Sequence, residues 1–558
     1  MSHIFFQTRT LIRFLLLITS ILASYLASYA QKPVPVCGTD YLGLVRTLRQ
    51  ASTTPDKAQT SSAPASATYT IPVVFVVYHT GEEVGVGSNV SQANIQGALD
   101  EMNRKFAGTN SGGSGIDTKI RFVLAKRMPN CTEFNGIYRI NASSFPDYSS
   151  QGVTSFDNAF ALAKAFPPFQ RSQPNDFLTI RVVRAMPFAA GFAQMGGGDI
   201  FVVSDGVDGS PGNGLLAHEM GHVLSLYHTF EGSSLVSGQY TCPPNANPLT
   251  QGDRVADTDP HKNNDFTCTP TDPNTCTGTN YGATLADNLM NYTCFRKFTQ
   301  GQITKMRDFL ADQLPGLTTS VFTQPPTSAD VLVTASCSIS LGYPPTNYVT
   351  GISRVKFNTI DRFSETFPTG NNTGNYSDFS CGAKTTVLPN TSYPFSLTTN
   401  SNQQKIYIDF NNDGNFNETN ELVFSTSSSV SSGNILIPAT AVTNVYLRMR
   451  VVVDPGSTAP TACNLPGAPT VGCGEIEDYG ILISAPCTQM YTLKSGQWND
   501  PTVWSCNRVP TQTDVTRVST GHTISVSTST ATARRVIYQT GGRVTFSAAG
   551  RLSIVNTL

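Results

Sequence analysis

Three of the seven histidines lie within eleven residues, in the segment HEMGHVLSLYH that runs from His218 to His228. In an α-helix, His218 and His222 are one turn apart on the same face, so both imidazoles can reach one Zn²⁺ ion. Glu219 lies beside that point and can act as a general base on a water molecule. The segment therefore predicts a metal-binding helix.

His228 constrains the fold more than any other residue. If the helix continued, His228 would lie about 15 Å beyond His218 along the axis, since each residue adds ~1.5 Å. The chain must therefore turn between His222 and His228, where the sequence has no glycine. We expect Ser225 to make the turn in a left-handed conformation, at a strain of about 1 kcal/mol. The competing interpretation is an ordinary amphipathic helix with surface histidines.

Composition narrows the class of protein. The chain of 558 residues has room for about three or four domains of ~150 residues. Charged residues make up 13% and the formal net charge is -1, with no basic block. Binding to nucleic acid through phosphate neutralisation is therefore not expected. Abundant Gly, Pro and uncharged polar residues favour an extracellular, β-rich protein.

Residues 1–30 have the features of a signal peptide. Arg9 and Arg13 precede an apolar run that extends to Ala30, with small residues at the expected cleavage site. A membrane anchor is the alternative, but the run is short for a span and contains Ser and Tyr. We therefore expect a secreted protein without membrane contact after cleavage, whose twelve cysteines can form disulfides.

Changes in composition divide the rest of the chain. Residues 31–67 are rich in Pro, Ser, Thr and Ala and cannot form a core alone, although residues 41–50 favour a short helix. Residues 68–317 alternate helix and strand patterns, which predicts a mixed α/β domain. The remaining segments are expected as a linker at 318–345, a β-sandwich at 346–486 and a C-terminal β module at 487–558.

Local patterns predict individual elements inside the α/β domain. Ser91 suits the N-cap of an amphipathic helix over 91–106. The expected strands are 71–78, 120–124, 177–183 and 200–203, and a second helix is expected over 214–226.

Four motifs of this domain resemble the metzincin zinc proteases and, among them, the pappalysin (cytophagalysin) family. The histidine segment is similar to HExxHxxGxxH, with Ser225 in the glycine position. GDRVADT at 252–258 resembles the family's GDxVxDT segment, NLMNY at 288–292 its Met-turn, and FTQGQ at 298–302 the helix start behind that turn. The resemblance covers roughly residues 69–315 and implies a metzincin-like catalytic domain with a twisted mixed sheet.

The resemblance implies a secreted zinc-dependent endopeptidase that hydrolyses proteins or peptides. One catalytic zinc ion would be held by His218, His222 and His228, leaving a fourth position for water. Glu219 would take a proton from that water and pass it to the leaving amine. A substrate would pair in extended form with a rim strand near residues 191–197.

Four further residues receive roles from the resemblance. Tyr292 would stabilise the oxyanion, and Met290 would lie beneath the three imidazoles. The alternative for each is an ordinary packing residue. Asp253 and Thr258 would bind calcium, for which an Asx turn without metal is the alternative.

The cysteines allow several arrangements. Residues 36–40 (VCGTD) resemble family propeptides, which implies a zymogen in which the Cys37 thiolate occupies the zinc and residues 31–67 are the propeptide. The alternative is a disulfide of Cys37 with Cys131. Four later cysteines allow three pairings, and the family suggests Cys242–Cys276 and Cys268–Cys294.

The later segments carry weaker signals. Asp409, Asn411 and Asp413 precede Gly414 in the pattern of a calcium loop, with an Asn/Gly-rich hairpin turn as the alternative. Together with GEIEDY at 474–479, this pattern resembles a GEVED-type β-sandwich of secreted proteins. The last segment, which holds Trp498 and Trp504, resembles the start of a β-solenoid.

A different class of function is compatible with the same sequence. The chain could be a non-catalytic adhesin or glycan-binding protein whose C-terminal β domains bind a surface or glycan ligand. Ser225 would then misplace His228 and leave the protease domain degenerate. Zinc content together with protein cleavage separates the two functions.

Overall fold

The computed structural model describes residue 37 and residues 67–555, except 110–114, 167, 170–172, 174, 266, 342–350, 365–375, 402, 418, 429, 469–473, 486–488 and 507. The expected signal peptide, the helix at 41–50 and most of the expected propeptide lie outside the described residues. No helix in the described part is long and apolar enough to cross a membrane.

The first domain is built around strand β1 (Tyr69–His79), which is buried along nearly its whole length. The sheet order is β2-β1-β4-β6-β5, and β3 pairs with the second half of β1 beyond β2. All pairs are parallel except β5 with β6, so β5 is an antiparallel edge strand. The other strands are β2 (Ile120–Leu124), β3 (Ile137–Asn141), β4 (Leu178–Val183), β5 (Gly191–Ala193) and β6 (Ile200–Val203).

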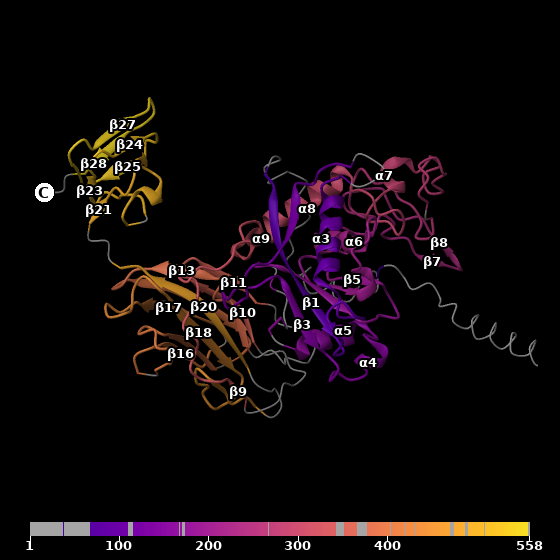
Figure 1. Ribbon diagram of the computed structural model, residues 1–558, viewed down its shortest axis with the longest axis horizontal. Helices are drawn as coiled ribbons and strands as arrows, with labels where there is room; N and C mark the ends of the chain where they lie inside the picture. The colour runs from indigo at the N-terminus through magenta and orange to yellow at the C-terminus, as the bar shows by residue number, and fades with distance from the viewer. Residues whose placement is uncertain are drawn as a thin grey trace, which may run out of the picture.

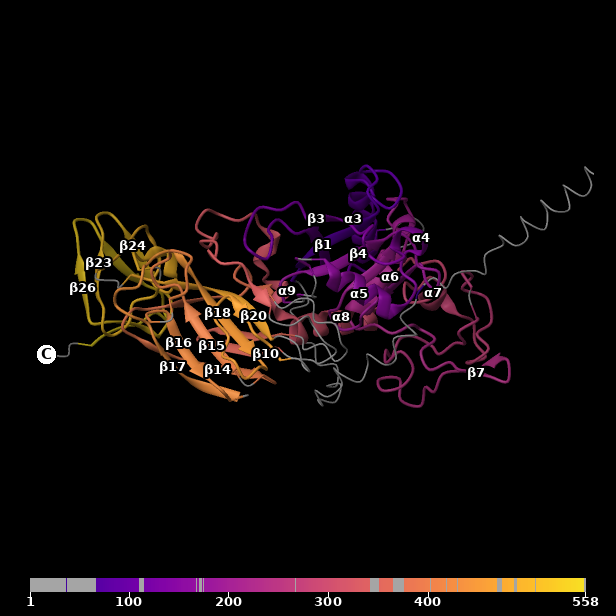
Figure 2. The same cartoon turned by 90° about the horizontal axis from the view of Figure 1, so that it is seen from below.

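Alternation along β1 separates two cores, because successive side chains of a strand point to opposite faces. Ile71, Val73 and Phe75 pack with α3 (Gln92–Phe106), α6 (Leu215–Val223) and α8 (Gln300–Gln313). Val74 and Val76 pack on the other face, where α4 (Tyr148–Gln151) and α5 (Phe156–Ala165) lie. The views in Figures 1 and 2 show these helices around the sheet.

The predicted elements of this domain are largely confirmed. Ser91 caps α3, and its side chain accepts a hydrogen bond from the Asn94 N–H. The strands at 120–124 and 200–203 have the predicted bounds. The helix expected to reach Leu226 ends three residues earlier, at Val223, because the chain turns there toward His228.

A β-sandwich follows, with its core between two sheets. One sheet has the order β11-β10-β14-β17, and the other has β12-β20-β18-β15-β16 with β13 also on β20. The strands are β10 (Ile352–Phe357), β11 (Ile360–Phe363), β12 (Tyr376–Asp378), β13 (Lys384–Val387), β14 (Ser392–Thr399), β15 (Gln403–Ile408), β16 (Leu422–Thr426), β17 (Val430–Leu436), β18 (Tyr446–Asp454) and β20 (Glu475–Ile483). In both views the sandwich lies between the first domain and the C-terminal module.

The C-terminal module stacks short parallel strands. The pairs form three small sheets, with orders β21-β23-β26, β22-β24-β27 and β25-β28. This parallel stacking has the pattern of a solenoid start, and Trp498 and Trp504 are buried in its core. The strands are β21 (Met490–Tyr491), β22 (Gly496–Gln497), β23 (Val515–Val518), β24 (Thr523–Val526), β25 (Ala531–Ala533), β26 (Arg535–Tyr538), β27 (Arg543–Phe546) and β28 (Leu552–Ile554).

The segment expected as a linker at 318–345 is packed against both neighbouring domains. Phe322, in η3 (Val321–Thr323), is buried in the core of the first domain. Cys337 forms a disulfide with Cys463 of the sandwich, and β9 (Ser340–Leu341) pairs with β19 (Asn464–Leu465). The sequence predicted a linker here, and its described residues do connect the two domains. Phe322 packs into the first domain and Cys337 bonds to the sandwich.

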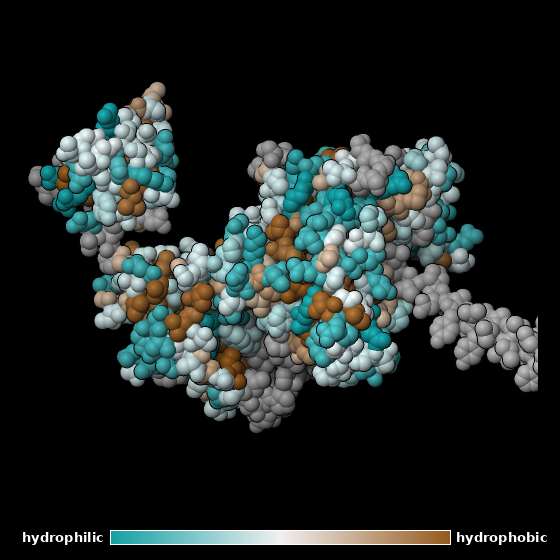
Figure 3. Space-filling model, in the orientation of Figure 1, coloured by the Kyte–Doolittle hydropathy of each residue, from teal (hydrophilic) through white to brown (hydrophobic). Residues whose placement is uncertain are grey.

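Short elements complete the described chain. They are η2 (Ser204–Gly206), the exposed hairpin of β7 (Leu235–Val236) and β8 (Gln239–Tyr240), α7 (Gly282–Ala286), α9 (Pro315–Thr318) and η4 (Pro501–Val503). The face drawn in Figure 3 is mostly hydrophilic or intermediate, with separate small apolar patches.

Candidate metal centre and active site

Helix α6 presents His218, Glu219 and His222, and all three side chains are buried. A carbonyl group fixes the orientation of each of these imidazoles. His218 Nδ1 lies 2.6 Å from the Leu289 carbonyl oxygen, and His222 Nδ1 lies 2.8 Å from that of Leu226. Because a carbonyl can only accept, each Nδ1 carries the proton and each Nε2 keeps a lone pair for a cation.

Ser225 ends the helix in the left-handed region, with φ of 75°. Its N–H donates to the His222 carbonyl, and the Leu226 N–H donates to the Gly221 carbonyl, each at 2.9 Å. These two bonds form a Schellman motif, the arrangement that usually places glycine at the left-handed position. The hydrogen-bonded turn therefore accommodates the serine, as the sequence predicted.

The turn brings His228 to the other two imidazoles. His228 Nε2 lies 3.2 Å from His218 Nε2 and 3.1 Å from His222 Nε2. Tetrahedral zinc with nitrogens at ~2.1 Å would separate them by about 3.4 Å, so the three imidazoles fit this ion. Ser225 thus does not displace His228 from the cluster.

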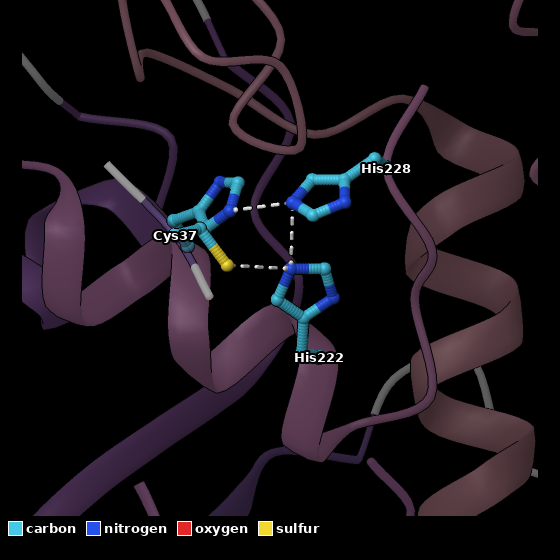
Figure 4. A group of neighbouring side chains, drawn as sticks. Cys37, His222 and His228 are labelled. Carbon is cyan, nitrogen blue, oxygen red and sulfur yellow. Dashed lines mark hydrogen bonds between the residues drawn. The ribbon is translucent and has the colours of Figure 1, made fainter. Parts of the chain in front are cut away.

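Cys37 completes a four-residue cluster (Figure 4). One ligand atom from each of Cys37, His218, His222 and His228 lies within 4.8 Å of every other. A metal site needs at least three His, Cys, Asp or Glu side chains close together. In the part of the chain that the structure describes, these four residues form such a group. Nitrogen and thiolate sulfur are the preferred zinc ligands.

The Cys37 thiol is in no disulfide, since Cys131 pairs with Cys381. The disulfide of Cys37 with Cys131, considered from the sequence, is therefore wrong. Cys37 Sγ lies 3.6 Å from both Glu219 Oε2 and His222 Nε2. Its backbone forms a parallel bridge with Gly191, the first residue of the edge strand β5.

Met290 and Tyr292 contact different parts of the site. Met290 is fully buried behind α6, and a Cβ atom on Gly221 would come within 2.4 Å of its sulfur. Gly221 is therefore needed for the helix to lie against this methionine. The Tyr292 hydroxyl donates to the Cys37 carbonyl at 3.4 Å, and its ring contacts that of His228.

Phe230 is a component of the site that the sequence did not reveal. Its ring stacks on the His228 imidazole, with the centroids 4.7 Å apart and the planes 7° from parallel. It also meets the Tyr292 ring edge to face at 4.8 Å. Phe230 follows the candidate ligand His228 by two residues, but this position only weakly indicates a role in the site. Many core phenylalanines lie close to polar residues in sequence.

The segment 252–258 is tied to helix α8. Asp257 Oδ1 accepts from the Thr299 hydroxyl at 2.6 Å, and Asp257 Oδ2 accepts from the Gly301 N–H at 2.8 Å. No individual role was expected for Asp257 from the sequence. Here it holds the N-terminus of α8, where a carboxylate also interacts favourably with the helix dipole.

The two residues expected to bind calcium in this segment are in direct contact. The Thr258 hydroxyl donates to Asp253 Oδ2 at 2.6 Å, and the Val255 N–H donates to Asp253 Oδ1 at 3.1 Å. Burial raises the pKa of Asp253 to about 7. The arrangement is that of an Asx-type turn, whose oxygens are also suitable calcium ligands.

The loop after β15 is closed by its own side chains. Asp409 is buried and accepts from the N–H groups of Asp413 and Gly414, at 3.1 and 2.9 Å. Asn411 Oδ1 accepts from the Asp413 N–H at 3.0 Å. Glu421, a residue that the sequence pattern did not single out, accepts from the Asn417 N–H at 2.8 Å. Backbone amides thus occupy the oxygens expected to bind calcium.

The acidic residues of GEIEDY have structural partners. Asp478 is fully buried and accepts two bonds of 2.7 Å from Arg450 and one of 2.8 Å from Arg448. Burial alone would raise the pKa of Asp478, but the two arginines lower it below its usual range. Glu475 accepts from the Ile352 N–H at 2.9 Å and so joins β20 to the other sheet. These acids hold the sandwich together.

Disulfides stabilise the long segment after the metal site. The structure contains Cys242–Cys276 and Cys268–Cys294, which is the pairing that the family resemblance suggested. Few apolar residues lie in this segment, so the two bonds replace a core there.

Comparisons with known proteins agree with this geometry. Residues 201–311 match the family described as pregnancy-associated plasma protein-A, and residues 403–482 match the GEVED domain. An extracellular metalloprotease of Arthroderma otae is 26% identical over 229 residues, which cover 40% of this chain and 72% of that protein.

Two solved structures are similar to parts of the chain. Promirolysin of Tannerella forsythia covers 52% of this chain and 97% of its own length, with 21% identity and a TM-score of 0.39. Mature mirolysin of the same organism, in complex with a cleaved peptide, covers 47% of this chain and 100% of its own, with 21% identity and a TM-score of 0.37.

The class of protein follows from the matched family and the histidine cluster: this is a metalloprotease. More narrowly, residues 201–311 match the pappalysin peptidase domain, and residues 403–482 match the GEVED domain that follows it.

Proposed function

We propose that the chain is a secreted zinc endopeptidase made as a zymogen. The observation that carries the proposal is the convergence of the Nε2 atoms of His218, His222 and His228, with neighbouring contacts of 3.1 and 3.2 Å. Three lone pairs directed at one point repel each other unless a cation lies between them. The expected signal peptide at residues 1–30 and the extracellular relative support secretion.

The three histidines would hold one zinc ion, which supplies the Lewis acidity that polarises a peptide carbonyl and lowers the pKa of water. Glu219 is next to His218 on the helix and would take the proton of the attacking water and deliver it to the leaving amine. The Tyr292 hydroxyl, now on the Cys37 carbonyl, would donate to the oxyanion once that segment has left. Substrate would pair with β5 in place of the Cys37 segment.

Cys37 supports the zymogen part of the proposal. Its sulfur contacts the proposed general base and one proposed ligand, so it lies where water and substrate need to be. A thiolate there would complete a four-ligand zinc site, which is the closed type without catalytic water. Release of the segment around Cys37 would open the site.

Calcium and the later domains form a separate part of the proposal. Calcium binding by Asp253 and Thr258 would require the Thr258 hydroxyl to rotate away from Asp253 toward the ion. Calcium binding by Asp409, Asn411 and Asp413 would break hydrogen bonds from backbone N–H groups to these side chains. We propose the first site over the second, because it needs the smaller rearrangement. The GEVED domain and the C-terminal module would bind a surface or glycan ligand.

The central experiment is protein cleavage by the chain after removal of the Cys37 segment, with casein as substrate. The Glu219→Gln variant should lose at least about 10²-fold in cleavage rate, because proton transfer contributes at least that factor, while it retains zinc. Glu133→Gln, at an exposed glutamate, is the matched control. Full activity of Glu219→Gln, or zinc-free protein that cleaves casein, would contradict the proposal.

A further inference from the structure

Two amide side chains connect helix α8 to the turn that contains Met290. Asn288 Nδ2 donates to Gln302 Oε1, and Gln302 Nε2 donates back to Asn288 Oδ1, both at 3.0 Å. Both residues have no exposed surface. A reciprocal pair of this kind, fully buried, fixes the distance and the orientation of the two segments that carry it.

Each amide also holds backbone on its own side. Asn288 Oδ1 accepts from the Met290 N–H at 2.8 Å, so it defines the conformation of residues 288–290. Gln302 Oε1 accepts from the Thr299 N–H at 3.0 Å, within the capping box that begins α8. Asp257 also holds this helix end, through Thr299 and Gly301.

The turn held in this way contacts the metal cluster directly. The Leu289 carbonyl accepts from His218 Nδ1 at 2.6 Å, and the Met290 carbonyl accepts from the Thr229 N–H, next to His228, at 3.1 Å. Partners of a ligand's second nitrogen set the tautomer and the direction of the ring. Residues 288–290 therefore orient one candidate ligand and position the chain next to another.

We propose that Asn288 and Gln302 are positioning residues for the metal centre: their amide pair holds the Leu289 carbonyl where it orients His218. The proposal rests on the proposed zinc function of the cluster. The pair acts through the backbone of the turn: the Leu289 carbonyl contacts His218, and the Met290 carbonyl contacts Thr229 next to His228. In the sequence, Asn288 belongs to the NLMNY motif and Gln302 to the FTQGQ motif, but the motifs do not show that the two side chains are in contact.

The test measures metal binding by the full chain, with zinc affinity from competition with a chelator and the visible spectrum of the Co²⁺-loaded protein. Asn288→Leu and Gln302→Met each leave the other amide buried without its partner. We expect each to weaken zinc binding about 10- to 100-fold, the range for loss of an outer-shell partner, and to change the cobalt bands. Gln300→Met, at an exposed glutamine of the same helix, is the control and should change neither.

The double variant Asn288→Leu/Gln302→Met separates positioning from stability. Removal of both partners eliminates the unpaired buried side-chain amides, so the melting temperature of the double variant should recover partly toward that of the wild type. Its zinc affinity should stay low, because the Met290 N–H still lacks the Asn288 oxygen. Zinc affinity that recovers together with the melting temperature would overturn the proposal, as would unchanged cobalt bands in the single variants.

The proposed function fails independently of this inference. A wild-type chain that binds zinc through the three histidines but cleaves no protein would refute the endopeptidase function, while the variants would still test the positioning role. A chain that cleaves protein normally with both amides replaced and zinc affinity unchanged would refute the positioning role alone.

Discussion

At the scale of single residues, Ser225 shows how a hydrogen-bonded turn compensates for an unfavourable side chain. The family pattern has glycine at this position, and the serine retains the left-handed conformation with φ of 75°. The two bonds of the Schellman motif stabilise the conformation against a strain of about 1 kcal/mol. The turn is needed because without it His228 would lie far along the helix axis.

Replacement of Ser225 by glycine should therefore stabilise the protein. We expect a gain of about 0.5–1 kcal/mol in the free energy of unfolding, because glycine adopts this conformation without strain. Zinc affinity should not change, since the position of His228 stays the same. Urea unfolding at equilibrium measures the gain.

The control for this variant is Ser150→Gly in helix α4, where the backbone is right-handed and glycine should destabilise. If Ser225→Gly also lowered the stability, the strain at Ser225 would not be real.

At the scale of elements, hydrogen bonds between side chains and backbone determine where helices and loops begin and end. The α6 helix ends at a backbone motif, and α8 begins at a capping box reinforced by Asp257. In the C-terminal module, Asp514 has a comparable role just before β23. It accepts two bonds from Arg508, at 2.6 and 2.7 Å, and one from the Thr511 N–H at 2.7 Å.

This carboxylate predicts a pH dependence of the C-terminal module. Burial alone would raise the pKa of Asp514, but the bonds from Arg508 and Thr511 lower it to about 2. A folded-state pKa below the unfolded value of about 3.9 stabilises the fold above that pH. The contribution should be lost as the pH falls from about 4 to about 2.

Melting temperatures of the whole chain between neutral pH and pH about 2.5, followed by tryptophan fluorescence, test this expectation, because both tryptophans lie in the module. The Asp514→Asn variant should show a smaller fall in melting temperature below about pH 4. Arg508→Gln should remove part of this pH dependence, because the bond from the Thr511 N–H remains. The two changes together should have no larger effect than Asp514→Asn alone. If the melting temperature still falls below about pH 4 to the same extent in both variants, other carboxylates cause the pH dependence.

At the scale of the whole molecule, the sandwich is fastened to the catalytic domain. Cys131 and Cys381 form a buried disulfide between residues 250 positions apart. Arg362 of the sandwich donates to both carboxylate oxygens of Asp176, at 3.0 and 2.9 Å, and both side chains are buried. Arg127 donates to the carbonyls of Gln324 and Pro325 at the same junction. The two domains therefore pack as one unit.

Cleavage between the domains should not separate them. A recognition site for a specific protease, inserted between Ser328 and Ala329 in an exposed part of the connection, allows the test. After cleavage, the two parts should run together on a non-reducing gel and separate only after reduction. Cys131→Ser/Cys381→Ser should separate without reductant in denaturing gels, although Cys337–Cys463 remains. Separation of the unsubstituted protein without reductant would refute the covalent connection.

Much of the fold and of the candidate site was predictable from short-range patterns. Strands such as 120–124 and the N-cap at Ser91 depend on neighbouring residues, so alternation and capping chemistry determine them. His218, Glu219 and His222 belong to one helix, where spacing alone fixes which side chains share a face. The need for a turn before His228 followed from helix geometry.

Other features required the tertiary structure. The partner of Cys131, the contact of Asn288 with Gln302 and the choice between the two predicted roles of Cys37 all depend on residues that are distant in sequence or lie in different elements. Residue types and spacing leave many such pairings open, because the chain between them can take many paths. The sequence by itself determined which groups could bind the metal. The packing of helix α8 against the turn at 288–290 decided which groups hold those side chains in place, because such contacts join separate elements.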